Sequence, residues 1–247
     1  MNVVAIVAVR LNSSRLPGKA LMDVAGEPML ARVVHRLERA RTLDRVVVAV
    51  AGCDENLPIV DLCREEGWDT YIGTPDTYED VLLRCYRAAV ARKADVFVRA
   101  IADCPLIEPT VVDLVVSSFL AEQPDLASNT IHRTWPRGLD VSVTSIEVLA
   151  LANQHAKKPH HRHHVTAYPY ELPRLLTLLP VVRAGADASG HRWTVDEMAD
   201  LALVREVYKR MGGRNDFHWL DVLSMVEDDR GLQQINAHVK QKGVKDL

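Results

Sequence analysis

The chain opens with the stretch VVAIVAVRLNSSRLPGK, residues 3–19, in which an apolar run leads directly into a basic loop. A continuous apolar run of this length is typical of a parallel strand that is buried on both faces. Ligands of open parallel sheets bind beyond the carboxyl ends of the strands, so the loop is the first candidate site. Its polar residues and glycine are Arg10, Asn12, Ser13, Ser14, Arg15, Gly18 and Lys19.

The alternation of strands and helices continues through the first half of the chain. Further apolar runs of strand length occupy residues 45–51 and 95–101. Helical patterns cover residues 28–37, 54–66, 77–92 and 109–120. Short buried runs that alternate with helices predict an α/β fold, with a three-layer, doubly wound and mostly parallel sheet.

The second half has a different pattern. Residues 125–143 predict short strands joined by a loop, where antiparallel elements join the sheet. Helices are predicted at 145–155 and in the histidine-rich segment 159–170, a strand at 175–182, and three helices in the tail. The clearest of these tail helices begins after Asp196. Because no repeat or linker marks a boundary, we expect one domain over residues 1–247.

Composition excludes several classes of protein. The 247 residues include 30 Lys and Arg and 33 Asp and Glu, a net charge of −3, whereas a dedicated nucleic-acid binder presents a strongly basic face. The four cysteines form no CxxC pair, which favours a reducing compartment over a disulfide framework or zinc knuckle. No window approaches the roughly 18 apolar residues of a membrane span. We therefore expect a cytoplasmic protein that binds neither nucleic acid nor membranes.

The loop after the first strand has the chemistry of a polyphosphate site. Backbone N–H groups and hydroxyls donate to phosphate oxygens, while Arg10, Arg15 and Lys19 neutralise charge. It is not a Walker A loop, because Ser13 and Ala20 occupy the positions of its first Gly and its Ser or Thr. A basic loop in isolation is more often a solvated turn. The position of this loop directly after the first strand favours a ligand-binding site over a solvated turn.

Two carboxylates follow other apolar segments. Asp103 comes directly after residues 95–101 in a turn that Pro105 stiffens, and Asp196 ends the segment RWTVD. Each alone could cap a helix. Together they offer hard oxygen ligands for Mg²⁺, and strand ends that converge would turn both toward one crevice.

These segments resemble the cytidylyltransferases that activate acidic sugars, which have the nucleotide-diphospho-sugar transferase fold. The branch of the spore coat polysaccharide biosynthesis protein F is most similar, and the synthetases of CMP-Kdo and CMP-acylneuraminate are related. Ser142 and His163 stand where Glu is usual in this family. The resemblance runs through RLNSSRLPGK (10–19), DCPLIEP (103–109), the segment 128–143 and RWTVDEMADL (192–201).

The resemblance implies Mg²⁺-dependent transfer of CMP from CTP to an acidic sugar or similar acceptor, with release of pyrophosphate, in polysaccharide or surface-glycan biosynthesis. The nucleotide half would be about residues 1–125 and the acceptor half about 126–247. Asp103 and Asp196 would hold the metal. The implied catalytic residues are Arg10, Arg15, Lys19, Asp103 and Asp196, and the nucleotide would also contact Ser13, Gly18, Gly73 and Asp76.

Recognition of the base and acceptor is less specific in the sequence. Gly73 and Asp76 lie in a turn that is expected to contact the base, although an ordinary connection fits equally well. The candidates on the acceptor side are Trp135, Arg137, Asp140 and His164.

The histidine-rich segment invites a metal-site interpretation. It contains His160, His161, His163 and His164. Adjacent histidines on a helix point to different faces, and no carboxylate lies at ligand spacing. The sequence therefore favours structural or acceptor-contact roles for them.

Two alternative functions and the oligomeric state complete the expectations. A glycosyltransferase of this fold would carry a DxD motif, which DCP at 103–105 is not. A non-catalytic sugar-nucleotide-binding protein would lack one of the implied catalytic residues, all of which are present. We also predict a homodimer, paired near residues 129–143, because Ile131, Trp135 and Leu139 are poorly placed for the main sheet.

Overall fold

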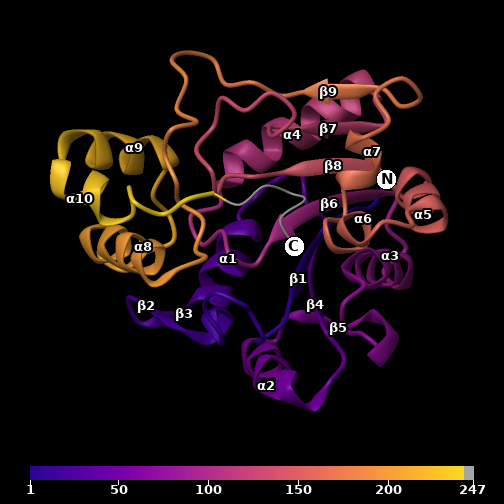
Figure 1. Ribbon diagram of the computed structural model, residues 1–247, viewed down its shortest axis with the longest axis horizontal. Coiled ribbons are helices and arrows are strands. Elements are labelled where there is room, and N and C mark those ends of the chain that lie inside the picture. The colour runs from indigo at the N-terminus through magenta and orange to yellow at the C-terminus, as the bar shows by residue number, and fades with distance from the viewer. Residues whose placement is uncertain (242–247) are drawn as a thin grey trace.

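The computed structural model describes residues 1–241 and is built around a seven-stranded sheet (Figure 1). The strands lie in the order β5-β4-β1-β6-β8-β7-β9. Strand β8 runs antiparallel to both of its neighbours, and the other neighbouring pairs of this sheet are parallel. The strands are β1 (Val3–Val9), β4 (Arg45–Val50), β5 (Asp69–Ile72), β6 (Val96–Ile101), β7 (Leu126–Ser128), β8 (Ser142–Ser145) and β9 (Leu178–Pro180).

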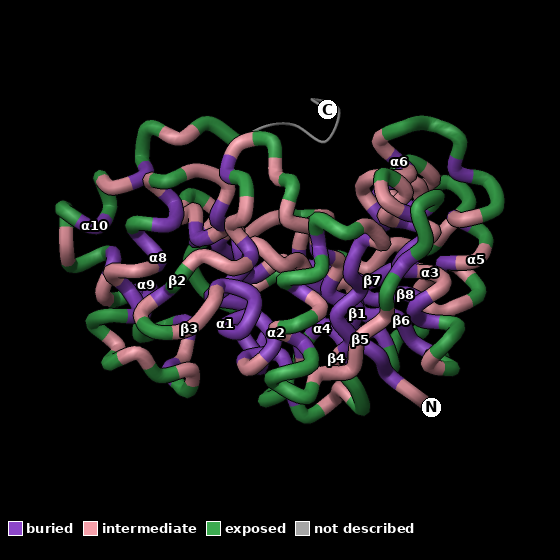
Figure 2. Tube along the Cα trace, turned by 90° about the horizontal axis from the view of Figure 1, so that it is seen from below, coloured by how far each residue is buried: buried purple, intermediate pink, exposed green. Residues whose placement is uncertain are grey.

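Helices cover both faces of the sheet because β1 is apolar on both sides. Its odd-numbered residues join a core beneath α1 (Met29–Leu37), α2 (Leu57–Glu66) and α4 (Pro109–Glu122). Val4 and Ile6 face α3 (Val81–Ala91) and α5 (Ile146–His155). Figure 2 shows buried chain running through the centre, with exposed segments around it. The predicted doubly wound α/β fold is confirmed.

The second half of the chain extends the same sheet. Strand β8 pairs with β6, so that Val143 lies opposite Val98. The C-terminal helices α8 (Met198–Arg210), α9 (Trp219–Asp228) and α10 (Arg230–Ile235) lie beyond α1 at one end of the molecule (Figure 1). The short strands β2 (Asp23–Val24) and β3 (Glu27–Pro28) form a separate ribbon beside them.

Three local features differ from the sequence prediction. Strand β5 was missing from the predicted runs because it is an edge strand with no fully buried residue. Helix α3 begins at Val81, because residues 75–77 form a 3₁₀ turn and Asp80 accepts a hydrogen bond from the Leu83 N–H at 2.9 Å. The histidine-rich segment is divided into α6 (Pro159–His163) and α7 (Ala167–Tyr170).

A buried ion pair fastens the C-terminal helices to the sheet domain. The Arg36 guanidinium on α1 lies 3.0 Å from the Glu108 carboxylate, and their side chains are 0% and 3% exposed. Arg36 also donates to the carbonyl oxygens of Ile107 and Asn215. The Glu108 carboxylate accepts a further bond from the backbone N–H of Trp219, the first residue of α9. This network joins α1, α4 and α9.

Within residues 1–241, no helix is both long and apolar enough to cross a membrane.

Candidate active site

The loop after β1 is folded by its own backbone. The N–H groups of Ser13 and Gly18 both donate to the carbonyl oxygen of Leu11, at 2.9 and 2.8 Å. Gly18 has a φ of 74°, a left-handed conformation that favours glycine. The chain then turns into the short 3₁₀ helix Lys19–Leu21. The loop is therefore a closed turn that carries Lys19 at its end.

Lys19 joins two carboxylates that are far apart in the sequence. Its Nζ lies 3.1 Å from Asp103 Oδ2 and 3.2 Å from Asp196 Oδ1. It also donates to the carbonyl oxygen of Val195 at 2.6 Å. The Lys19 and Asp196 side chains are 14% and 13% exposed, so the group is partly open to solvent.

Two arginines surround Asp196 from other directions. Arg15 Nη2 lies 2.9 Å from Asp196 Oδ1, and Arg192 Nη2 lies 2.9 Å from Oδ2. Arg192 also pairs with Asp200, a fully buried carboxylate that accepts from the Asp196 N–H at 3.0 Å. We call Arg15, Lys19, Asp103, Asp196, Arg192 and Asp200 the strand-end cluster.

Sequence reasoning did not single out Arg192 or Asp200. Both belong to the segment RWTVDEMADL, which was used only for its resemblance and for Asp196. Their contact also depends on the turn into α8, where Asp200 caps the helix by accepting from the Glu197 N–H. The one available signal was the spacing of Arg192, Asp196 and Asp200, four residues apart, which can place side chains on one side of a turn.

Opposite charges fix the protonation states of this cluster. Burial lowers the pKa of Lys19, but the nearby Asp103 and Asp196 carboxylates outweigh it and raise that pKa above its ordinary value. Burial acts to raise the pKa of Asp196, but Lys19 and Arg15 lower it overall. At neutral pH, Lys19 is therefore an ammonium and Asp196 a carboxylate.

The donor set of this cluster fits a hard divalent cation. Asp103 and Asp196 supply carboxylate oxygens, the ligand type that Mg²⁺ prefers, and phosphates and water commonly complete its coordination. The two carboxylates already stabilise one cation between them, the Lys19 ammonium.

Arg10 lies in a different environment from Arg15 and Lys19. Its guanidinium is 2.8 Å from Glu79 and lies 5.3 Å from the centre of the Tyr78 ring. Among the contacts of residues 1–241, none joins it directly to Lys19 or Asp103. Arg10 therefore lies against the segment before α3, apart from the strand-end cluster.

The predicted base-binding turn follows β5 and packs tightly against β4. The Gly73 N–H donates to the Val50 carbonyl oxygen at 2.9 Å. A Cβ on Gly52 would lie 1.8 Å from the Gly73 oxygen, so the two turns meet backbone to backbone. Asp76 is exposed, pairs with Arg87 at 3.0 Å and accepts from the Thr74 hydroxyl, a bond that lowers its pKa.

The acceptor-side candidates occupy distinct surroundings. Asp140 receives two hydrogen bonds of 2.7 Å from Arg133. The Arg137 backbone pairs with the segment that carries Asp196, because its carbonyl accepts from Trp193 at 2.7 Å. Burial lowers the pKa of the half-buried Arg137 guanidinium, and nearby Arg133 lowers it further. His164 ends α6 and is partly buried.

Trp135 is part of the hydrophobic core. It is 5% exposed, its indole donates to the Val181 carbonyl oxygen at 3.0 Å, and its ring lies 5.2 Å from that of Trp219. Leu139 is fully buried in the same core. Their apolar character is explained within one chain, so of the three residues used to predict a dimer only Ile131 has partly exposed surface.

A hydroxyl network occupies the position where the family usually has a glutamate. Ser142 Oγ lies 2.9 Å from Ser128 Oγ and 3.2 Å from the Tyr170 hydroxyl. Tyr170 in turn lies 2.7 Å from Thr130 Oγ1. These four neutral side chains lie beside β7 and β8.

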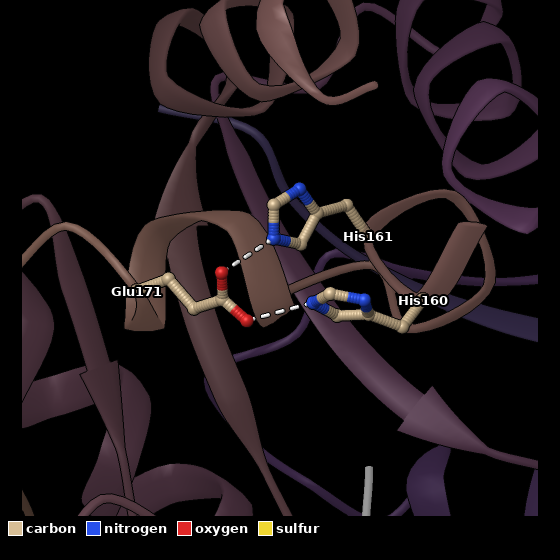
Figure 3. A group of neighbouring side chains, drawn as sticks. All are labelled: His160, His161 and Glu171. Atoms are coloured by element: carbon tan, nitrogen blue, oxygen red, sulfur yellow. Dashed lines mark hydrogen bonds and ion pairs between the residues drawn. The ribbon is translucent and has the colours of Figure 1, made fainter. Parts of the chain in front are cut away.

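The argument against a carboxylate near the histidines was wrong. His160 and His161 both point at Glu171, which follows α7 (Figure 3). Their Nε2 atoms lie 2.7 and 2.9 Å from its two oxygens. The sequence argument assumed one continuous helix. The chain turns between α6 and α7, and this turn brings the carboxylate back to both rings.

The fold and the strand-end cluster suit chemistry on a phosphate. A basic turn at the carboxyl end of a doubly wound sheet, with two aspartates beside its lysine, supplies the cations and carboxylates that phosphoryl transfer uses. A sequence profile described as cytidylyltransferase matches residues 4–205. The chain belongs to the cytidylyltransferase family and is a nucleotidyltransferase.

Individual relatives agree with this family. The chain is 36% identical over 129 residues to the 3-deoxy-manno-octulosonate cytidylyltransferase of Chlorobaculum tepidum, a match that covers 50% of this chain and 48% of that protein. It is 23% identical over 231 residues to the spore coat polysaccharide biosynthesis protein SpsF of Bacillus subtilis, covering 91% and 94%. These matches confirm the resemblance found in the sequence.

A solved structure shares the fold. The structure of a cytidylyltransferase from Leptospira borgpetersenii superposes with a TM-score of 0.88, at 23% identity, covering 98% of both chains.

Proposed function

We propose that this enzyme transfers CMP from CTP to an acidic sugar or a similar acceptor, with Mg²⁺, in polysaccharide or surface-glycan biosynthesis. The single observation that carries this proposal is the contact of Lys19 with both Asp103 and Asp196, which joins the turn proposed to bind phosphate to the two carboxylates proposed to hold the metal. The names of the two relatives, an octulosonate cytidylyltransferase and a spore coat polysaccharide protein, support the substrate class.

The proposed reaction is an in-line displacement at phosphorus. An oxygen of the acceptor forms a bond to the α-phosphorus of CTP, and the bond from that phosphorus to the bridging oxygen of pyrophosphate breaks. Catalysis of such a step rests mainly on positioning and on stabilising negative charge. Mg²⁺ held by Asp103 and Asp196 would add positive charge where the transition state gathers negative charge.

The cations of the chain would bind the triphosphate. Lys19, which now contacts two carboxylates, would exchange them for oxygens of the leaving pyrophosphate. Arg15, beside Asp196, and Arg10, near Tyr78, would neutralise the remaining charge. The Ser13 hydroxyl would donate from the turn, Gly18 would let the backbone approach the phosphates, and Gly73 and Asp76 would lie near the base.

The acceptor would lie between the strand-end cluster and β8. Arg137 lies on that side and suits an acidic group of the acceptor. Asp140, held by Arg133, suits a hydroxyl. The hydroxyl network around Ser142 replaces a usual carboxylate, so it favours an acceptor that differs from those of the usual family members at this position.

The direct experiment is a screen of acidic sugars with CTP and Mg²⁺, monitored for pyrophosphate. Pyrophosphate that depends on both CTP and an acceptor supports the proposal, and ATP or GTP should release less. A glycosyltransferase would release a nucleotide from a sugar nucleotide and no pyrophosphate. A sugar-nucleotide-binding protein would release neither product.

We further propose that the enzyme acts as a cytoplasmic, single-domain homodimer. The family resemblance supports the dimer, with pairing near residues 129–143. Light scattering at micromolar concentration should give twice the chain mass. A monomer mass there would refute the dimer.

A further inference from the structure

A second group of side chains, from α6 and the residue that follows α7, has the composition of a metal site. We propose that His160, His161 and Glu171 bind a divalent transition metal of the zinc class, separately from the strand-end cluster. Their candidate ligand atoms all lie within 4.8 Å of one another. Figure 3 shows both imidazoles turned toward the one carboxylate.

The donor atoms decide which metal the site would take. Imidazole nitrogen suits zinc and its transition-metal neighbours, whereas Mg²⁺ prefers oxygen ligands. Two histidines and a glutamate are also the donor set of known open zinc sites, in which water or another ligand fills the fourth position. The His160, His161 and Glu171 group and the strand-end cluster should therefore select different ions.

The surroundings leave room for such an ion and a water ligand. The His161 side chain is 6% exposed and that of Glu171 is 30% exposed, so the group lies at the protein surface with one ring inside. A cavity of about 280 Å³ adjoins it. Lys158 Nζ lies 3.0 Å from Glu171 and is 62% exposed, so it can withdraw into solvent when a metal takes its place.

The positions of the imidazole protons of His160 and His161 determine how tightly a metal ion should bind. In the ion-free protein, the Nε2–H groups of His160 and His161 donate to Glu171. An ion at Nε2 moves each ring proton to Nδ1. The Nδ1 atom of His161 is buried and has no hydrogen-bond partner among residues 1–241. Because ligating histidines normally donate through their second nitrogen, we expect an exchangeable ion here.

Helix α6 connects this group to the nucleotide side of the molecule. Arg162, the next residue after His161, donates to the Asp80 carboxylate at 2.8 Å. Asp80 caps α3, immediately after the Tyr78 and Glu79 that contact Arg10. An ion that links α6 to Glu171 should therefore stabilise the native fold and restrain the segment before α3 that contacts Arg10.

The test titrates the full chain with Zn²⁺ by calorimetry and records the visible spectrum with Co²⁺. We expect one saturable ion per chain, a rise in Tm that EDTA reverses, and no equivalent effect of Mg²⁺. His160→Asn and Glu171→Gln should each weaken Zn²⁺ binding by at least about tenfold. His163→Asn, a neighbouring histidine on the same helix that is outside the group, should leave it within about twofold.

The Co²⁺ spectrum keeps the test independent of variant folding. Intense d–d absorption from low-coordinate Co²⁺ in the native chain supports the site. The proposal is wrong if the native chain and the Glu171→Gln variant bind Zn²⁺ equally, or if His163→Asn loses as much affinity as His160→Asn. Absence of any saturable binding would show that the group is only an ion-pair contact between α6 and Glu171.

Discussion

Two groups of charged side chains join distant parts of this chain, and they differ in access to solvent. Arg36 and Glu108 are 0% and 3% exposed, and they hydrogen-bond to the backbone of Ile107, Asn215 and Trp219. Lys19 and Asp103 are 14% and 22% exposed and lie at the carboxyl end of the sheet. Both groups are ion pairs, but only the second can exchange its partners with a ligand.

The difference separates a structural role from the catalytic role that we propose. A buried pair that is broken leaves an unpaired charge in the core, so its loss lowers the stability of the fold. A pair that solvent can reach loses less stability when it is broken, because water replaces part of the lost interaction. We expect the Lys19 and Asp103 pair to act through the charges that it presents to a ligand.

The largest expected effect is on the buried pair. Arg36→Met should lower the free energy of unfolding by about 3–5 kcal/mol, because Glu108 is left buried and unpaired. Urea denaturation measures this loss. Arg39→Met removes an exposed arginine from the same region and should change stability by less than about 0.5 kcal/mol. Equal losses of stability in Arg36→Met and Arg39→Met would contradict the structural role of the buried pair.

Lys19→Ala should lower activity and leave stability almost unchanged, the opposite of Arg36→Met. Loss of a charge-assisted contact of about 1.5–3 kcal/mol in the transition state predicts a fall in kcat/KM of roughly 10- to 150-fold. Tm should change little. Pyrophosphate release from CTP measures the activity, and Lys209→Ala, which removes an exposed lysine on α8, provides the control. Unchanged turnover would exclude Lys19 from the reaction.

Gly18→Val tests the turn that presents Lys19. The sequence alone predicts that Gly18→Val would do damage by crowding the backbone. In the structure, however, a Cβ at Gly18 would meet no atom within 4 Å. The left-handed φ of 74° is the cause instead, and forcing a β-branched residue into it costs about 1–2 kcal/mol. We expect CTP affinity to fall about tenfold, which corresponds to about 1.4 kcal/mol, near the middle of this range. Gly190→Val, at an open position without positive φ, should leave affinity unchanged.

The smallest effect concerns acid stability. The pKa of Asp196 is lowered in the fold, so its contribution is present above the unfolded pKa of about 3.9 and is lost as the pH falls through the lower folded pKa. The pKa of Lys19 is raised in the fold, so the contribution of Lys19 to stability is fully present at every pH below its ordinary pKa. It therefore does not change in the acid range. Tm should fall less steeply below about pH 4 in Asp196→Asn than in the native chain. Identical profiles would contradict the pairing.

Patterns along the chain predict the parts of this fold that are buried on both faces. Strands β1, β4 and β6 were found because their runs are mostly apolar, and the edge strand β5 gave no such run because its faces are half exposed. Asp103 and Asp196 were found because each follows a strand-like segment. A strand end can be predicted from local sequence.

Side chains that are brought together only by the tertiary fold left no pattern of this kind in the local sequence. Glu171 reaches His160 and His161 only because α6 and α7 are separate helices. The burial of Trp135 depends on α9, which begins far along the chain with Trp219. These contacts are set by how the C-terminal half folds back onto the sheet, and neither periodicity nor spacing records that.

The central claim is that Asp103 and Asp196 act as one unit at the strand end. A double-mutant cycle of Asp103→Asn and Asp196→Asn, measured as Mg²⁺-dependent pyrophosphate release from CTP, tests it most directly. Each single change should abolish most of the turnover, and the double change should cost little more than the worse single one. Additive losses of stability, with the Mg²⁺ dependence of turnover intact in both variants, would contradict the claim and leave the two aspartates as independent helix caps.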